Sequence, residues 1–155
     1  MSQMRVVPVE GPGDLAAAMA IREVVFIEEA AIPLDIERDD LDVTAFHVLA
    51  MLDGHAVGTG RLVASDEVPP GETGTWNRIG RMAVVAKHRK AGAGRAILEV
   101  LEAKARENAA KGIVLHAQVH ARTFYDRLGY APFGEVFEEA GIPHVRMWKK
   151  FREAG

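Results

Sequence analysis

The sequence predicts a mixed α/β fold in which helices pack on a central sheet. Three observations lead to this prediction. Strand-like and helix-like segments alternate along the chain, Asp53-Gly54 separates two strand-like runs, and residues 94–110 carry apolar side chains at helical spacing. The chain has 155 residues, of which 48% are hydrophobic and 26% are charged. It contains no internal repeat or long linker, so we predict a single domain over residues 1–155.

The predicted elements follow the order β-α-β-β-β-α-β-α-β-β. Short apolar runs between turn residues predict the strands, and apolar residues three or four positions apart predict the helices. The strands are expected at residues 5–9, 45–52, 56–64, 79–85, 113–119, 130–137 and 145–149, and the helices from about 15 and at 94–110 and 121–128. This order predicts a mixed sheet packed by helices.

Turn and cap residues mark the ends of these elements. Asp14 is expected to cap the first helix, and Pro33 to end or follow it. Asp53-Gly54 is the commonest short hairpin signal, and residues 65–74 form a turn-rich connection. Gly129 is expected to stop the helix that precedes it.

Composition and charge argue against several classes of protein. The formal net charge is −3, which gives no bulk attraction to nucleic acid. The absence of cysteine excludes a cysteine nucleophile and thiolate metal sites. The first residues lack the apolar stretch of a signal peptide, and no apolar run approaches the length of a membrane span. We therefore expect a cytoplasmic protein that binds neither nucleic acid nor membranes.

The most informative segment, residues 82–97, leads from an apolar strand through a basic glycine turn into an amphipathic helix. A helix N-terminus carries unpaired backbone N–H groups and the positive end of the helix dipole, so it favours an anion. Gly92 and Gly94 let the backbone approach a phosphate without an intervening Cβ atom. Arg89 and Lys90 in the turn and Arg95 at the start of the helix add positive charge.

One other interpretation of this segment remains open, and two other phosphate-binding motifs are excluded. The turn can be a flexible connection with solvated cations. A Walker loop is excluded because the Gly-Lys-Ser/Thr ending is absent, and a dinucleotide-binding fold because Ala96-Ile97 stands where its third glycine belongs.

Two signatures resemble those of the GNAT acyltransferases. The first, Arg/Gln-x-x-Gly-x-Gly/Ala, is matched by Arg89, Gly92 and Gly94. The second, Asn-x-x-Ala-x-x-Phe-Tyr-x-x-x-Gly-Phe, is similar to residues 118–130, with Gln118 in place of asparagine and Tyr130 in place of phenylalanine. The resemblance covers about residues 5–150.

A small bacterial GNAT subfamily is similar to further segments, namely residues 21–29, 32–33, 37–42, 45–47 and 137–147. A glutamine often follows the glutamate pair of that subfamily, and this chain has Ala30 at that position. The resemblance implies the GNAT fold, a mixed and mostly antiparallel sheet of six to seven strands flanked by helices, with splayed strands at the cofactor site.

The same resemblance implies direct transfer of an acetyl group from acetyl-CoA, as cosubstrate, to a primary amine without a metal. We expect a small-molecule amine in preference to a peptide or protein amine, and the resemblance suggests a homodimer. The residues that it assigns to the cofactor are Met82, Ala83, Val84, Arg89, Lys90, Ala91, Gly92, Ala93, Gly94, Arg95 and Tyr125.

Tyr125 matches the family tyrosine near the sulfur of CoA and is the predicted general acid, although it can equally pack a short helix against the sheet. The general base is less obvious, because residues 78–84 contain no acidic side chain. Glu29 is the base that we put forward; the alternatives are Asp39, Asp42, His116, His120 or a water relay.

Two further points stay open. The acidic run at residues 37–42 either attracts a cationic acceptor or is a solvated loop. Among His47, His116, His120 and His144, only His116 and His120 have the His-x-x-x-His spacing of a zinc site. That spacing spans a predicted strand-to-helix junction, so we expect no metal. A non-catalytic acyl-CoA-binding or sensing module is the alternative to the enzyme.

Overall fold

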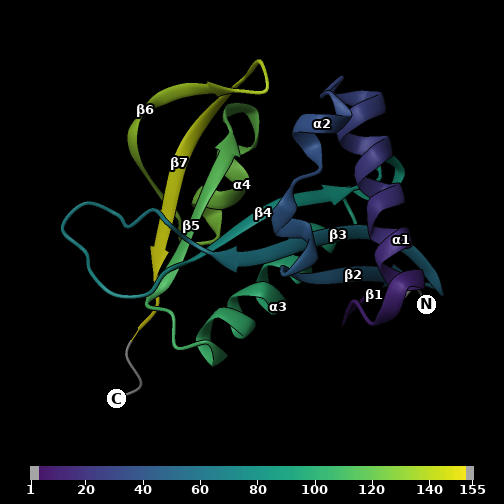
Figure 1. The fold of residues 1–155 in the computed structure, drawn as a ribbon, viewed down its shortest axis with the longest axis horizontal. Coiled ribbons are helices and arrows are strands. Elements are labelled where there is room, and N and C mark those ends of the chain that lie inside the picture. Colours follow the sequence, from purple (N-terminus) through teal and green to yellow (C-terminus); the bar gives the residue numbers. More distant parts are fainter. Residues whose placement is uncertain (1–3, 153–155) are drawn as a thin grey trace. The chain divides into compact units, whose positions relative to one another are not determined.

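The computed structural model describes residues 4–152, in which seven strands form one sheet in the order β1-β2-β3-β4-β5-β7-β6 (Figure 1). The strands are β1 Met4–Pro8, β2 Phe46–Leu52, β3 His55–Ala64, β4 Asn77–Val84, β5 Gly112–Gln118, β6 Ala131–Glu139 and β7 Ile142–Lys150. β4 pairs with β5 in parallel, whereas the β1/β2, β2/β3, β5/β7 and β6/β7 pairs are antiparallel. The predicted mixed, mostly antiparallel sheet is confirmed.

Eight helical segments accompany the strands in the described part of the chain. They are α1 Gly11–Arg22, the π-helix η1 Glu23–Glu29, α2 Leu34–Glu37, α3 Ala93–Glu107, α4 Arg122–Arg127 and the 3₁₀ segments η2 Asp40–Val43, η3 Ala86–His88 and η4 Val119–Ala121. No helix among residues 4–152 is long and apolar enough to cross a membrane.

The chain forms two compact units. Within the described residues, unit 1 comprises 4–63 and 81–101, and unit 2 comprises 64–80 and 102–152. Strand β4 passes from unit 2 to unit 1 after Gly80, where Arg81 adopts the left-handed φ of 52°. The pairing of β4 with β5 covers Asn77–Ile79, within unit 2.

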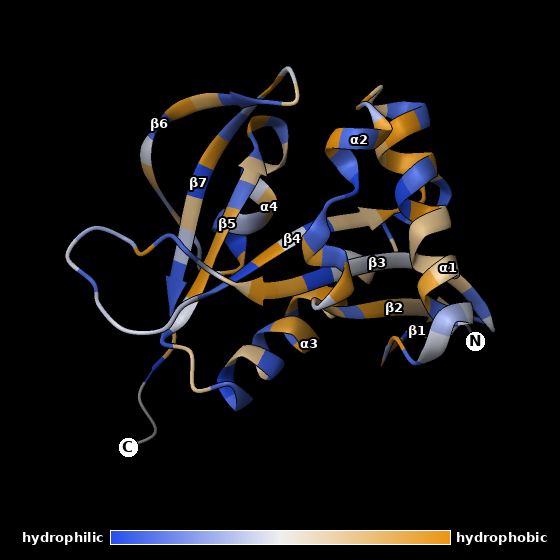
Figure 2. Ribbon diagram, viewed as in Figure 1, coloured by the Kyte–Doolittle hydropathy of each residue, from blue (hydrophilic) through white to orange (hydrophobic). Residues whose placement is uncertain are grey.

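Unit 1 packs helices on both faces of its strands. On one face, Ala18, Ile21 and Phe26 of the α1–η1 helix pack with Leu49 and Ala83. On the other face, α3 lies so close to β3 that a Cβ atom at Gly60 would come within 2.7 Å of Ile97. The hydrophobic colouring of β2 and the mixed colouring of α3 in Figure 2 agree with a buried strand and an amphipathic helix.

The β2–β3 hairpin is confirmed. Asp53 and Gly54 have φ angles of 51° and 83°, the left-handed pair that a two-residue hairpin turn requires. Leu52 pairs with His55 directly beside this turn. Asp53-Gly54 therefore determines where β2 ends and β3 begins.

The first helix differs from the prediction. It begins at Gly11 with Pro12 in its first turn, and Glu10 occupies the N-cap position. Asp14 is not the cap; its carboxylate accepts a hydrogen bond from the Glu10 N–H at 2.9 Å. The helix continues as the π-helix η1, in which Phe26 is buried and Val24 is 40% exposed.

Residues 35–42 are also not the predicted loop. They contain α2 and η2, and Asp39 and Asp42 form a capping box at the start of η2. Short helical turns of this kind have no apolar periodicity that the sequence can reveal.

Unit 2 has its own core around β5. Trp76 is 1% exposed, and its ring lies 5.8 Å from that of Trp148. A Cβ atom at Gly112 would overlap the carbonyl of Lys149, so only glycine fits at the start of β5. β6 pairs with β7 on both sides of an irregularity between Phe133 and Phe137.

Candidate active site

The glycine turn in unit 1 has the backbone geometry of an anion site. Gly92 has a φ of 86°, and no atom lies within 4 Å of where its Cβ would be. The first intrahelical hydrogen bond of α3 runs from the Ala96 N–H to the Gly92 carbonyl at 3.1 Å. The N–H groups of Ala93, Gly94 and Arg95 precede that bond and have no acceptor within the helix. The turn is open, and these donors lie at the positive end of a 15-residue helix.

The positively charged side chains near this turn differ in the ion pairs and hydrogen bonds that they make. Lys87 and Lys90 are exposed and make no ion pair within the described residues. Arg95 pairs with Glu99 one helical turn away at 3.0 Å. Arg89 donates from Nε to the Val84 carbonyl at 2.9 Å, which links the turn to the end of β4.

Arg89 also contacts the predicted base. Its Nη2 lies 2.6 Å from Oε2 of Glu29, and both side chains are partly exposed. The structure thus brings Glu29 to the glycine turn and pairs it with Arg89.

Tyr125 lies on α4 in unit 2. Its ring makes edge contacts with Phe124 at 5.0 Å and with Tyr130 at 5.9 Å. Burial raises the pKa of the Tyr125 phenol to about 12, so the phenol is protonated at neutral pH. Tyr130, in contrast, has a structural role because its hydroxyl donates to Glu102 at 2.8 Å, and Glu102 also pairs with Lys149 at 3.1 Å.

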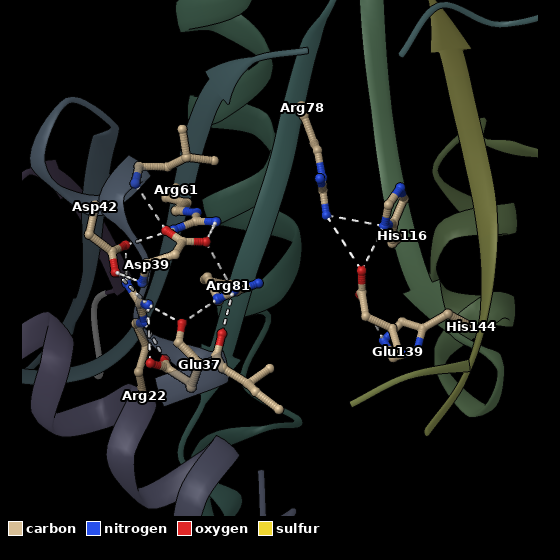
Figure 3. Close-up of polar contacts among 12 residues, drawn as sticks. Arg22, Glu37, Asp39, Asp42, Arg61, Arg78, Arg81, His116, Glu139 and His144 are labelled. Carbon is tan, nitrogen blue, oxygen red and sulfur yellow. Dashed lines mark hydrogen bonds and ion pairs between the residues drawn. The ribbon is translucent and has the colours of Figure 1, made fainter. Parts of the chain in front are cut away.

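The acidic run belongs to a buried ion network in unit 1 (Figure 3). Arg22, 1% exposed, donates from Nε to Glu37 at 2.5 Å and from Nη1 to Asp42 at 2.7 Å. Arg61, 4% exposed, donates from Nη1 to Asp39 at 2.7 Å and to Asp42 at 2.8 Å. These carboxylates are neither a solvated loop nor an open surface for a cationic acceptor, so both interpretations of the run fail for them.

Arg81 completes this network from β4. Its Nε donates to the Glu37 carbonyl at 2.8 Å, and its Nη2 lies 3.3 Å from Asp39. Hydrogen bonds from arginines hold the pKa of Asp39 and of Asp42 below the usual range, so neither base candidate takes up a proton near neutral pH. The sequence analysis missed the arginines, although a charged residue inside an apolar helix or strand, such as Arg22 or Arg61, signals a buried partner.

A second polar cluster occupies unit 2. His116 on β5 lies 2.5 Å from Glu67 through Nε2 and 3.1 Å from Glu139 through Nδ1. Arg146 donates to Glu67 at 2.6 Å, and Arg78 lies 3.1 Å from Nδ1 of His116. The hydrogen bond with His116 lowers the pKa of Glu139 to about 2, so this carboxylate stays ionised.

The remaining histidine candidate, His120, is exposed, and its Nε2 contacts the Gln118 side chain at 2.5 Å. Within residues 4–152, no three histidine or acidic side chains are grouped in a way that could hold a metal ion.

Comparison with known proteins identifies the family. A family model described as an acetyltransferase (GNAT) domain matches residues 25–151. The chain belongs to the GNAT acetyltransferase family. A relative, the uncharacterised N-acetyltransferase YjcF of Bacillus subtilis, is 33% identical over 147 residues, which cover 94% of this chain and 99% of YjcF.

Solved structures support the same GNAT fold. ElaA of Escherichia coli superimposes with a TM-score of 0.77 at 27% identity, covering 97% of this chain and all of ElaA. An acyl-CoA N-acyltransferase from Pseudomonas aeruginosa superimposes with a TM-score of 0.76 at 28% identity, covering 96% of this chain and 99% of that structure. GNAT proteins use acyl-CoA as cosubstrate.

Proposed function

We propose that this GNAT protein is an acyl-CoA-dependent N-acyltransferase that moves an acetyl group from acetyl-CoA directly to a primary amine. The observation that carries the proposal is the open turn at Gly92, beside the first N–H groups of α3 and two exposed lysines, Lys87 and Lys90, that make no ion pair within residues 4–152. A pyrophosphate matches such a turn because its oxygens accept several hydrogen bonds and carry the complementary charge.

The proposed cofactor contacts follow from this placement. The pyrophosphate would lie against residues 89–95, and the pantetheine arm along Met82, Ala83 and Val84 of β4, which η3 connects to the turn. Arg89 already links the turn to Val84. A bound pyrophosphate would compete with Glu29 for the Arg89 guanidinium, so cofactor binding and the Glu29 ion pair are expected to be linked.

Tyr125 is the proposed proton donor to the leaving group. The amine nitrogen attacks the thioester carbonyl, the C–S bond breaks, and its electron pair leaves with sulfur. The phenol gives its proton to the thiolate and regains one from the nitrogen that has become the amide, so the tyrosine is restored. A phenol with a raised pKa suits this role because it carries its proton throughout the neutral range.

The acceptor is proposed as a small-molecule amine. The acidic residues 37, 39 and 42 do not recognise its charge, since arginines occupy them. The cytoplasmic location and the homodimer stay predictions. The non-catalytic acyl-CoA-binding module stays the alternative, because the described residues 78–84 lack an acidic side chain that could act as the base.

A thiol-release assay tests the proposal. Purified protein is mixed with acetyl-CoA and a panel of small amines, and free CoA is measured with a thiol reagent alongside calorimetry of cofactor binding. Amine-dependent thiol release supports the enzyme. Tight acetyl-CoA binding without release for any amine would instead support the binding module, and no binding would reject both.

A further inference from the structure

We propose that Arg81 binds a carboxylate of the acceptor, and that the acceptor is therefore a small primary amine with a carboxylate, such as a free amino acid. The inference rests on the proposed function and narrows the class of acceptor. All the residues that carry it belong to unit 1, which contains the last part of β4 and the glycine turn.

Arg81 occupies a position in β4 that glycine would fit with less strain. Its φ of 52° is left-handed, a conformation that is unfavourable for a residue with a Cβ atom and free of that cost for glycine. Strained residues of this kind are concentrated at ligand-binding positions. Arg81 directly precedes residues 82–84, to which we assign the pantetheine arm. Arginine at this position points to a role for its side chain.

The Arg81 guanidinium is anchored through two of its three nitrogens. Nε donates to the Glu37 carbonyl at 2.8 Å, and Nη2 lies 3.4 Å from the Ile36 carbonyl and 3.3 Å from Asp39 (Figure 3). These contacts fix the orientation of the planar group.

The third nitrogen, Nη1, is open. It forms no hydrogen bond within residues 4–152, and the Arg81 side chain is 22% exposed. In the part of the chain that the structure describes, the one buried side-chain nitrogen or oxygen without a partner is Nε of Arg61. Nη1 of Arg81 is therefore in contact with solvent, as a donor that is held in place and accessible to a ligand.

Arg81 has the weakest carboxylate contact of the three arginines in the ion network. Arg22 and Arg61 each pair with a carboxylate oxygen at 2.7 Å, whereas the contact of Arg81 is 3.3 Å long. Burial disfavours the charge of Arg22 and Arg61, but hydrogen bonds to carboxylates outweigh it and raise the pKa of both. For Arg81, burial and the nearby charge of Arg61 prevail, and its pKa is lowered. The guanidinium remains protonated at neutral pH, so an anion beside it would be stabilised.

The acceptor is the source of this anion. The phosphates of the cofactor are assigned to residues 89–95, beyond η3, whereas the pantetheine arm at residues 82–84 ends in the thioester. The acceptor amine has to reach that thioester to attack it, so the acceptor is the ligand that comes close to Arg81. Carboxylates are the anions that guanidinium groups bind best in small amines, through charge-assisted hydrogen bonds.

The same network argues against an acceptor with a second cationic group. The carboxylates at residues 37, 39 and 42 are already paired with arginines. Arg81 would repel another cation, and a neutral substituent would leave Nη1 with water alone. We therefore expect amino acids to be acetylated better than simple amines, and simple amines better than diamines.

Pairs of amines that differ only in the carboxylate test this expectation in the thiol-release assay. Suitable pairs are leucine with isoamylamine, phenylalanine with phenethylamine, and lysine with cadaverine. In each pair that is acetylated, kcat/KM of the wild type should be roughly 10- to 100-fold higher for the amino acid, the factor that a hydrogen bond to a charged group contributes.

Two variants remove the guanidinium in different ways. Arg81→Gln removes its charge, and Arg81→Gly also relieves the strain at the left-handed φ. Both should bring the ratio of kcat/KM within a pair close to one, whereas Arg81→Lys should retain part of the preference because the charge remains. A structural defect would lower both amines of a pair alike and leave their ratio unchanged.

Arg38→Gln is the matched control. Arg38 follows α2 in the same unit, is 41% exposed and lies 3.9 Å from Glu23, so its loss should not alter the ratio. Calorimetry with acetyl-CoA shows whether each variant still binds the cofactor. If the Arg81 variants do not fold, inhibition of the wild type decides the matter: hydrocinnamate, which is phenylalanine without its amino group, should compete with the amine, and its amide should not.

Three results overturn the inference alone. They are a wild type that acetylates amines without preferring the amino acid of any pair, folded Arg81→Gln and Arg81→Gly variants that keep the full wild-type ratio, or equal inhibition by hydrocinnamate and its amide. The proposed function would survive each of these results. In contrast, a wild type that releases no thiol with any amine rejects the proposed function, and the inference with it.

Discussion

Replacing Asp42 by asparagine is expected to destabilise the protein by about 3–5 kcal/mol, the usual cost of removing one partner from a buried ion pair. Asp42 accepts hydrogen bonds from Arg22 at 2.7 and 3.0 Å and from Arg61 at 2.8 Å. Those two arginines are 1% and 4% exposed, so neither can turn to water when the carboxylate is lost. The asparagine NH₂ group would also face guanidinium donors.

The charge balance explains why one substitution matters so much. The network sets the guanidinium groups of Arg22, Arg61 and Arg81 against three carboxylates at residues 37, 39 and 42. Asp42→Asn leaves one buried positive charge without compensation. Surface ion pairs contribute only about 0–1 kcal/mol, so a buried network and a solvated acidic loop predict clearly different losses.

Urea and thermal unfolding followed by circular dichroism measure the effect. At about 2–4 °C per kcal/mol for a domain of this size, the midpoint should fall by roughly 6–20 °C. Asp40→Asn is the control, because Asp40 lies on the same 3₁₀ segment, is exposed and has no ion pair within residues 4–152. A loss at Asp42 below about 1 kcal/mol, or equal to that at Asp40, would refute the reasoning.

The remaining predictions concern pH, the cofactor and the chemistry. The pKa of Asp42 is lowered in the folded state, so its contribution to the free energy of unfolding is complete above an ordinary aspartate pKa of about 3.9 and is lost as the pH falls further. The difference in free energy of unfolding between wild type and Asp42→Asn, measured in urea, should therefore become smaller below about pH 4. Gly92→Asp should abolish acetyl-CoA binding by calorimetry, whereas Gly134→Asp, at another open glycine with positive φ, should not; equal affinities for both variants would reject the phosphate site. Tyr125→Phe should lower kcat by about 100-fold or more while acetyl-CoA affinity stays the same, and parallel losses in both would indicate packing instead.

Local sequence was sufficient for the elements whose signals are local. Asp53-Gly54 predicted the hairpin because its left-handed φ angles are needed whatever surrounds it. The glycine turn before α3 was predicted for the same reason. The start of α1 and the short helices in residues 34–43 were predicted wrongly, since a four-residue helix has no periodicity and depends on contacts made elsewhere.

The sequence did not predict which side chains pair with one another. Arg22 and Asp42 are 20 residues apart, and Glu67 and His116 are 49 apart, so nothing local indicates that they meet. Their pairing changed the interpretation of the acidic run from a surface to a buried network. It also changed the set of base candidates, because Glu29, Asp39, Asp42 and His116 all have charged partners.

By itself, the sequence determined the family signatures, the order of strands and helices, and the turn at Gly92. Backbone conformation at glycines and apolar periodicity depend mainly on residues that are neighbours in the sequence. The tertiary structure decided which charges are buried together, such as Arg22 with Glu37 and Asp42. Those properties depend on distances between side chains from separate strands and helices, and only folding sets such distances.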